Sequence, residues 1–290
     1  MKTPLVYYGG KQNMVSHILP LIPKHELYCE PFCGGAAVFW NKEPSKSETL
    51  NDLNYFVSNF WYVLQRYPDR LIDRIERYMH SRSALKYANF IYNHAGLFSR
   101  IEKAWSAYAM SQLGYLSLFG DTFAYGRATF NKRDRVYDQD RCVQSNFNAR
   151  EYLRNNLLVM RSRLRNVSLE NMDAVKCILS RDNEVAFHYC DPPYINTNCG
   201  HYGSYNEQDY ERLLTTLANI KGKFLLSSFP NEPLTRYCKE HGWNIIEINK
   251  NSSATKFVED GSIKRRLKTE VLVMNYEIQT LFNQGNKLFE

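Results

Sequence analysis

The feature that most constrains the fold is an alternation of short apolar runs with helical segments at both ends of the chain. Residues 26–30 form a short strand-like run that leads into a glycine turn and a helical segment from Ala36 to Trp40. A second run near 49–50 then ends at Asn51-Asp52. A strand, a glycine turn, a helix and a strand ending in an acid are typical of the first half of a doubly wound nucleotide-binding fold.

The same alternation resumes near residue 167, so the expected sheet is built from two separate parts of the chain. We expect strands at 26–30, 49–50, 167–170, 185–190, 224–227, 244–249 and 270–276. We expect helices at 12–19, 36–40, 148–164, 173–179, 207–220 and 232–241. Residues 54–113 read as helical without strand punctuation, and 114–147 read as irregular. The pattern therefore predicts an α/β sheet interrupted by a mostly helical insertion, with parts at 1–54, 55–147 and 148–290.

Composition favours an ordinary globular protein, with 44% hydrophobic and 23% charged residues. We see no signal segment and no apolar run of membrane-spanning length, so no membrane partner and a cytoplasmic location are expected. The seven cysteines include no Cys-x-x-Cys pair, which gives little support to a zinc cluster and favours reduced, buried thiols. No metal is expected.

The positive charge of the chain is concentrated in one segment. The net charge is +7, and residues 127–165 hold ten basic residues against four acidic ones. A single basic segment is the electrostatic footprint expected for binding a polyanion. A solvated helix face is the alternative for this segment taken alone.

The strongest local signal is Asp191-Pro192-Pro193-Tyr194, directly after the apolar run 185–190. Ligands of open α/β sheets bind beyond the carboxyl ends of the strands, so this tetrapeptide is expected to face the crevice. The prolines have no backbone donor, which leaves their carbonyl groups free to accept. The Asp191 carboxylate and the Pro192 carbonyl suit an exocyclic amine of a base, against which the Tyr194 ring could stack.

Two further segments point to a ligand at the same edge. Glu30-Pro31-Phe32-Cys33-Gly34-Gly35 is a glycine turn between strand and helix, and Asp52, about twenty residues later, suits ribose hydroxyls. The missing G-x-G-x-x-G spacing argues against NAD. Tyr7-Tyr8-Gly9-Gly10-Lys11 lacks the Walker spacing of a phosphate loop, but an aromatic ring and a lysine beside a glycine turn suit a zwitterionic cofactor.

In this order, the three segments resemble the Dam-type, class-α DNA adenine methyltransferases. That family places an aromatic-x-Gly-Gly-Lys motif first, then a Glu-Pro-Phe-x-Gly turn and a strand ending in Asp-x-Asn. A target-recognition insertion and Asp-Pro-Pro-Tyr follow. The resemblance implies a Rossmann-like methyltransferase sheet, S-adenosylmethionine as cofactor, and methyl transfer to N6 of a flipped adenine in double-stranded DNA. It also raises a cognate restriction endonuclease as a partner.

Carried over to this sequence, the resemblance implies two sets of residues at the site. The cofactor-binding set is Tyr7, Gly10, Lys11, Glu30, Phe32, Gly34, Asp52, Asn171, Met172 and Asp191, and the catalytic set is Asp191, Pro192, Pro193 and Tyr194. The chain departs from the family at Asn171-Met172, where Asp-Phe is usual. It also departs at Tyr7, a tryptophan in many relatives, and at Ala36, which replaces the last glycine of the turn.

The expected DNA-binding residues come from two basic regions. They are Tyr115, Arg127, Lys132, Arg133 and Arg135 in the insertion, and Lys264, Arg265 and Arg266 on an expected loop before the last strand. Basic side chains supply phosphate contacts, and one or two of them could read base edges. Two alternatives stay open from the sequence: a methyltransferase acting on cytosine N4 or on RNA, and a catalytically inactive DNA-binding relative.

Overall fold

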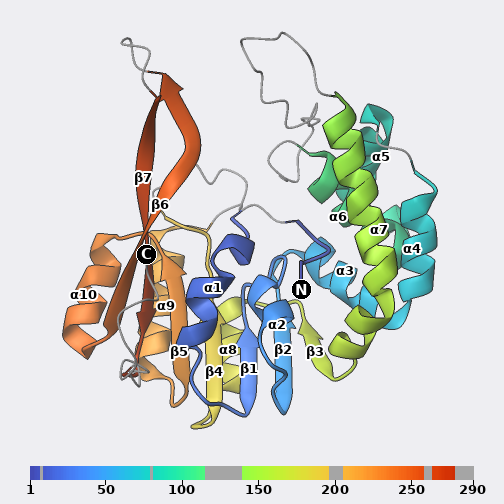
Figure 1. Ribbon diagram of the computed structural model, residues 1–290. Helices are drawn as coiled ribbons and strands as arrows, with labels where there is room; N and C mark the ends of the chain where they lie inside the picture. The colour runs from blue at the N-terminus through green and yellow to red at the C-terminus, as the bar shows by residue number, and fades with distance from the viewer. Residues whose placement is uncertain (7–8, 79–80, 115–138, 196–204, 258–262, 278–290) are drawn as a thin grey trace.

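The computed structural model describes residues 1–6, 9–78, 81–114, 139–195, 205–257 and 263–277, with side chains throughout except at 139–147 and 250–268. Its centre is a seven-stranded sheet with the order β3-β2-β1-β4-β5-β7-β6 (Figure 1). The strands are β1 (Leu27–Glu30), β2 (Ser47–Asn51), β3 (Val167–Glu170), β4 (Ala186–Cys190), β5 (Lys223–Ser228), β6 (Asn244–Phe257) and β7 (Ile263–Met274). β1 to β5 run parallel, and β7 lies antiparallel between β5 and β6. Every strand expected from the sequence is present.

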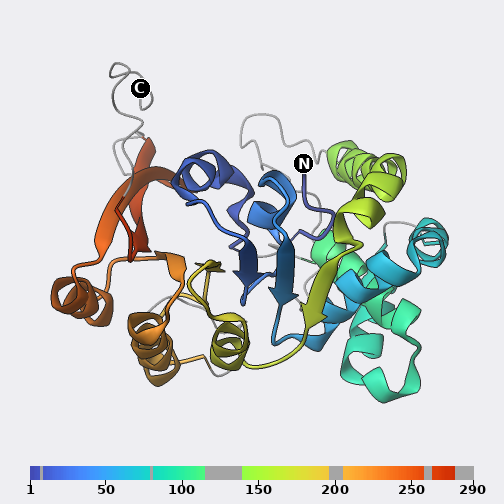
Figure 2. The same ribbon diagram turned by 90° about the horizontal axis from the view of Figure 1, so that it is seen from below.

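Helices cover both faces of this sheet (Figure 2). α1 (Val15–Ile18) and α2 (Ala37–Asn41) lie on one face, and α8 (Ala174–Arg181), α9 (Glu207–Asn219) and α10 (Glu232–His241) lie on the other. The helix expected at 12–19 is wrong in part, because α1 is flanked by 3-10 turns at Lys11–Asn13 and Leu19–Leu21. Pro20 in the second turn has no N–H to donate, so an α-helical hydrogen bond is lost there. In the described ranges no helix combines the length and the apolar character needed to cross a bilayer.

Helices α3 to α7 enter the chain between β2 and β3. They are α3 (Tyr55–Arg66), α4 (Pro68–Glu76), α5 (Arg82–Asn93), α6 (Arg100–Leu113) and α7 (Gln139–Leu164). Side chains cap three of them at their first turns, since Asn54, Ser81 and Ser99 each accept a backbone N–H. α7 is continuous through residue 148, where the sequence placed a domain boundary.

The helical insertion shares its core with one face of the sheet. Trp61 of α3 and Trp105 of α6 belong to the same cluster of buried side chains as Phe187 of β4 and Leu272 of β7. A second cluster on the opposite face joins α8, α9 and α10 to the sheet. Burial of apolar surface therefore fixes the insertion against the sheet at its base.

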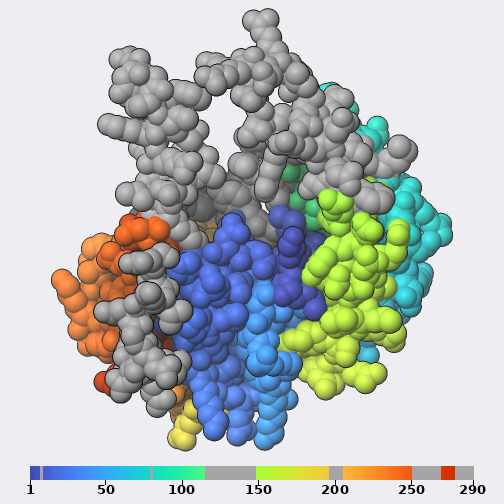
Figure 3. Space-filling view, viewed as in Figure 1, coloured from blue at the N-terminus to red at the C-terminus, as the bar shows by residue number. Residues whose placement is uncertain are grey.

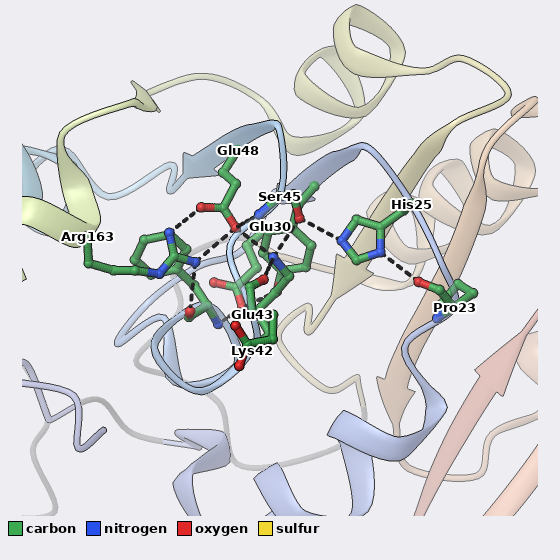
Figure 4. A network of polar contacts seen from close by, with 10 residues as sticks. Pro23, His25, Glu30, Lys42, Glu43, Ser45, Glu48 and Arg163 are labelled. Atoms are coloured by element: carbon green, nitrogen blue, oxygen red, sulfur yellow. Dashed lines mark hydrogen bonds and ion pairs between the residues drawn. The ribbon is translucent and has the colours of Figure 1, made fainter. Parts of the chain in front are cut away.

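Buried charges reinforce the attachment of α7 to the sheet (Figure 4). The guanidinium of Arg163 pairs with both carboxylate oxygens of Glu48 on β2 and donates to the Phe39 carbonyl at 3.1 Å. Lys42 donates to the same carboxylate at 2.6 Å, and both Lys42 and Glu48 are buried. Desolvation opposes ionisation of Glu48, but the hydrogen bonds from Arg163 and Lys42 outweigh it and hold the pKa of Glu48 below its usual value.

β6 and β7 form a long hairpin that projects beyond the sheet (Figure 1). The last residue of β5, Ser228, pairs with Val271, so residues 263–270 extend past the carboxyl ends of the parallel strands. The loop expected at Lys264–Lys268 is therefore wrong, because this basic run is part of β7 and pairs with β6. The hairpin and helices α5 to α7 stand on opposite sides of the same end of the sheet.

Candidate active site

The candidate site lies at the carboxyl edge of the parallel strands, where three strand ends meet. β1 lies between β2 and β4, and Glu30 at its end is level with Leu50 of β2. Asp52 follows β2 and Asp191 follows β4, so these two acids flank the end of β1. Neighbouring strands lie about 4.8 Å apart, which sets the two acids about 10 Å apart along this edge.

An ion pair joins the N-terminal segment to the end of β4. The Lys11 ammonium lies 2.7 Å from Asp191 Oδ1, and only 6% of Lys11 is exposed. The same ammonium donates to the Gly9 carbonyl at 3.0 Å and lies 4.8 Å from the centre of the Tyr194 ring. The structure therefore brings together Lys11, Asp191 and Tyr194, which the sequence assigned to one site.

The N-terminal segment that carries Lys11 packs on the glycine turn after β1, in the middle of the face shown in Figure 3. The Thr3 hydroxyl donates to the Gly35 carbonyl, and Thr3 N donates to Gln12 Oε1 at 3.2 Å. A Cβ atom at Gly35 would lie 2.7 Å from the Leu5 carbonyl oxygen. Glycine is therefore required at position 35 for this close approach of two backbones.

Asp52 holds the glycine turn from the opposite side. Its carboxylate accepts the backbone N–H of Gly34 at 2.9 Å and that of Asn54 at 2.8 Å. Desolvation outweighs these hydrogen bonds and raises the pKa of Asp52 to about 6. The side chain is partly exposed, and a carboxylate has about four lone-pair positions, so it can accept further hydroxyl groups.

Two residues of the glycine turn adopt left-handed backbone conformations, Gly34 with φ 44° and Ala36 with φ 53°. Trp61 of α3 donates to the Gly34 carbonyl at 3.0 Å and so links the turn to the insertion. Ala36 stands where the family has a glycine, and it keeps the left-handed conformation that glycine favours. Its Cβ atom gives this conformation a steric cost that glycine would not have.

Glu30 lies beneath the turn, with 2% of its surface exposed. Its Oε1 accepts the Tyr28 hydroxyl at 2.7 Å and the backbone N–H of Phe39, in the first turn of α2, at 3.1 Å. Burial raises the pKa of Glu30 to about 8, so the carboxyl group is largely neutral at pH 7. These contacts anchor β1 to α2. The assignment of Glu30 to cofactor binding stays a prediction.

The side-chain amides of Asn51 and Asn171 hold the Asn171-Met172 segment beside Asp52. The Asn51 side chain donates to the Met172 carbonyl at 3.0 Å and accepts its N–H at 3.0 Å. The Asn171 amide donates to the carbonyl groups of Asp52 and Leu53 at 2.8 and 3.0 Å. A carboxylate at position 171 could not donate to these carbonyls, which gives the neutral side chain a structural role here.

The remaining predicted residues also lie near this edge. Pro192 is buried and Pro193 is partly buried. Gly10 immediately precedes the 3-10 turn that begins with Lys11. Phe32 packs edge-on against Tyr205 at 6.2 Å between ring centres, and Tyr194 packs edge-on against Phe229 at 4.5 Å.

Sequence reasoning missed two residues of this cluster. The Tyr194 hydroxyl donates to Glu270 Oε1 on β7 at 3.0 Å, and it lies 3.0 Å from the Ser227 hydroxyl on β5. Glu270 Oε1 is also 3.8 Å from the Lys11 ammonium. For Glu270, the only signal in the sequence was a single acid at the start of an apolar strand.

Several predicted residues lie outside the described parts of the structure. They are Tyr7 and the insertion residues Tyr115, Arg127, Lys132, Arg133 and Arg135. Lys264, Arg265 and Arg266 are placed by backbone only, on the part of β7 that extends past the sheet. Their roles stay predictions.

Residues 7–254 match the family of D12 class N6 adenine-specific DNA methyltransferases, a match that includes the Lys11, Asp52 and Asp191 positions. The chain belongs to this family. It is therefore a DNA adenine methyltransferase, and S-adenosylmethionine is the methyl donor that the family implies.

The relatives of this D12 class enzyme have low sequence identity to it, but the matches cover most of this chain. Type II methyltransferase M1.LlaDCHI of Lactococcus lactis subsp. cremoris is 28% identical over 92% of this chain and 93% of its own length. Modification methylase StsI of Streptococcus sanguinis is 27% identical over 99% of this chain, and Type II methyltransferase M.FokI of Planomicrobium okeanokoites is 25% identical over 95%. The matches span 44% and 43% of those two relatives, less than half of their length.

Proposed function

We propose that the chain transfers a methyl group from S-adenosylmethionine to N6 of an adenine flipped out of double-stranded DNA, at a specific sequence. The contact between Lys11, Asp191 and Tyr194 carries this proposal. It sets a hydrogen-bond acceptor and an aromatic ring side by side at the carboxyl edge of the sheet, where α/β folds bind ligands.

The residues beside β2 fit the cofactor. Asp52 is partly exposed, and its carboxylate is held by two backbone N–H groups and has the capacity to accept the two ribose hydroxyls. Left-handed Gly34, without a Cβ, lets a ligand approach the backbone closely. Asn51 holds Met172 beside the end of β2 through two hydrogen bonds to its backbone. The Met172 side chain would pack there on the adenine ring of the cofactor. When bound, the cofactor supplies the electrophilic methyl group.

The residues after β4 fit the target base. We assign to the Asp191 carboxylate and the Pro192 carbonyl the role of accepting the two hydrogens of the exocyclic amine, which directs the lone pair of its nitrogen toward the methyl group. Desolvation outweighs the attraction of Lys11 and raises the pKa of Asp191, so its carboxylate is a stronger acceptor for those hydrogens. The Tyr194 ring provides the stacking surface for an unstacked base.

Two parts of the fold would hold the DNA across this edge. Residues 55–147 are the proposed target-recognition domain, and the β6–β7 hairpin stands on the opposite side of the sheet from its helices α5 and α6 (Figure 1). Replacing Arg133 and Arg135 together, or Arg265 and Arg266 together, by alanine should weaken binding to every DNA sequence. Each lost phosphate contact should flatten the logarithmic salt dependence of binding by about 0.9. An unchanged salt slope for either pair would remove that pair from the interface.

Label transfer from tritiated S-adenosylmethionine, followed by nucleoside analysis, tests the reaction itself. We expect the label in N6-methyladenine from duplex DNA of mixed sequence. Label in N4-methylcytosine, or transfer to RNA and not to DNA, would overturn the choice of base or substrate. Tight DNA binding without transfer to any nucleic acid would instead identify an inactive DNA-binding protein.

A cognate restriction endonuclease is a proposed partner, because relatives of this chain are type II methyltransferases and modification methylases. Sequencing of modified bases after expression in a methylation-free host would give the recognition sequence. An endonuclease from the same source that cuts this sequence only when it is unmethylated would support the partnership. Absence of any such activity would support a methyltransferase that acts alone.

A further inference from the structure

Glu270 occupies a position that neither the sequence motifs nor the family match single out. It is the first residue of β7 beyond the end of β5, since Val271 pairs with Ser228. Its side chain is 11% exposed, although it carries a carboxyl group. A buried acid at the edge of a site needs polar partners, because desolvation without them is costly.

Two partners of Glu270 are residues of the proposed active site. Its Oε1 accepts the Tyr194 hydroxyl at 3.0 Å and lies 3.8 Å from the Lys11 ammonium. Asp191 shares the same ammonium at 2.7 Å. Two carboxylates therefore face one lysine in a site that the proposed function fills with a sulfonium cofactor.

We propose that Glu270 is a positioning residue for methyl transfer, which orients the Tyr194 ring through its hydroxyl and offers Lys11 a second carboxylate beside Asp191. This inference rests on the proposed function. The ring of Tyr194 is fixed at its far end by Glu270 and Ser227, and at its edge by Phe229. Lys11 can lean toward Glu270 when Asp191 accepts the amine of the base, so the ammonium keeps a counter-ion throughout.

The same arrangement affects the titration of Asp191. Desolvation is the largest influence on its pKa, Lys11 opposes it, and the charge of Glu270 raises the pKa further. Glu30 on β1 and Tyr189 on β4 also interact electrostatically with Asp191, and the Tyr194 hydroxyl lowers its pKa. Removing the charge of Glu270 while the others remain should therefore lower the pKa of Asp191.

A direct test of the Tyr194 contact needs no enzymatic activity. In protein labelled with 3-fluorotyrosine, the ¹⁹F signal lost in Tyr194→Phe identifies this ring. We expect Glu270→Gln to shift that signal and Glu247→Gln to leave it unchanged. Glu247 is the matched control because it is exposed on the neighbouring strand β6. An unshifted Tyr194 signal in Glu270→Gln would overturn the inference whether or not the wild type transfers methyl groups.

The kinetic test uses the same variants. Glu270→Gln should lower kcat about tenfold with a smaller change in KM, and should move the acid limb of the kcat–pH profile to lower pH. Adding Glu270→Gln to Tyr194→Phe should lower kcat less than it does in the wild type, because the hydroxyl that it orients is already gone. A kcat within twofold of wild type, or a loss of kcat with an unmoved pH profile, would contradict the inference. A wild type that transfers no methyl group would instead refute the proposed function.

Discussion

The Lys11 ammonium lies 2.7 Å from the Asp191 carboxylate, although one residue belongs to the N-terminal segment and the other follows β4. The pair is largely buried, so both charges have lost most of their hydration. The attraction between them offsets part of that loss. Asp191 can accept a target amine only by sharing or exchanging this partner. The ion pair therefore links the order of the N-terminal segment to the reactivity of the proposed catalytic carboxylate.

Asp191→Asn should lower the rate of methyl transfer at least a hundredfold, because the acceptor that faces the amine loses its charge. DNA binding should stay within a fewfold of wild type, since the phosphate contacts are expected on the insertion and the hairpin. Rapid-quench measurements with tritiated cofactor and a filter-binding assay give the two values, with Glu247→Gln as a control. Loss of DNA binding along with transfer would mean that Asp191 mainly maintains the fold.

Affinity for S-adenosylmethionine should fall as the pH is lowered through about 6, the pKa of Asp52 in the protein. Ribose hydroxyls donate to the ionised carboxylate, and protonation removes that acceptor. The dissociation constant measured by calorimetry should be flat above pH 7 and about tenfold higher at pH 5. Asp52→Asn should bind more weakly with this pH dependence removed, whereas Asp69→Asn on the surface of α4 should behave as wild type. Equal affinity of the wild type at pH 5 and 7.5 would exclude this role for Asp52.

Folding stability should decrease between pH 4.5 and about 8 through Glu30. Its pKa in the folded protein is about 8, above the ordinary value of 4.5, so in this window the folded state binds a proton that the unfolded state has released. The contribution is fully present below pH 4.5 and is lost as the pH rises to 8. Denaturant unfolding at pH 6 and 8.5 should show a smaller drop for Glu30→Gln than for the wild type. Identical drops would mean that Glu30 is ionised in the fold.

Arg163→Ala should destabilise the protein by about 2 kcal/mol, because the buried Glu48 carboxylate loses its hydrogen bonds from Arg163 and keeps only those from Lys42 and Ser45. It also leaves the Phe39 carbonyl without this donor. Arg161→Ala is the matched control, since Arg161 lies on the exposed side of the same helix. Urea unfolding should separate the two variants clearly. Equal stability would show that apolar burial alone attaches α7 to the sheet.

The parallel part of the sheet was predictable because its strands are short, buried runs that end in turn or acidic residues. Val167–Glu170 was placed within its exact bounds, as was the helix Glu232–His241, whose Asn231 cap is visible in the sequence. The hairpin was underestimated for a physical reason. Its distal half projects beyond the sheet, and the apolar alternation that marks a strand is missing from Lys264–Lys268.

The site was predictable wherever a residue type is tied to a backbone feature. The Gly34 N–H donates to Asp52, and Lys11 lies beside Asp191 and Tyr194. Glu270 was not predictable, because its role depends on the pairing of Val271 with Ser228 and on the extension of β7 beyond that pair. No local pattern encodes the register between two strands that are far apart in the chain.

The central claim is that one crevice, between the ends of β2 and β4, holds both the cofactor and the target adenine. A crystal structure with bound S-adenosylhomocysteine tests it most directly. We expect the ribose hydroxyls within hydrogen-bond distance of Asp52, and the sulfur atom on the side of the pocket that faces Asp191 and Tyr194. A ligand bound away from Asp52, or one whose sulfur is shielded from Asp191, would contradict the account.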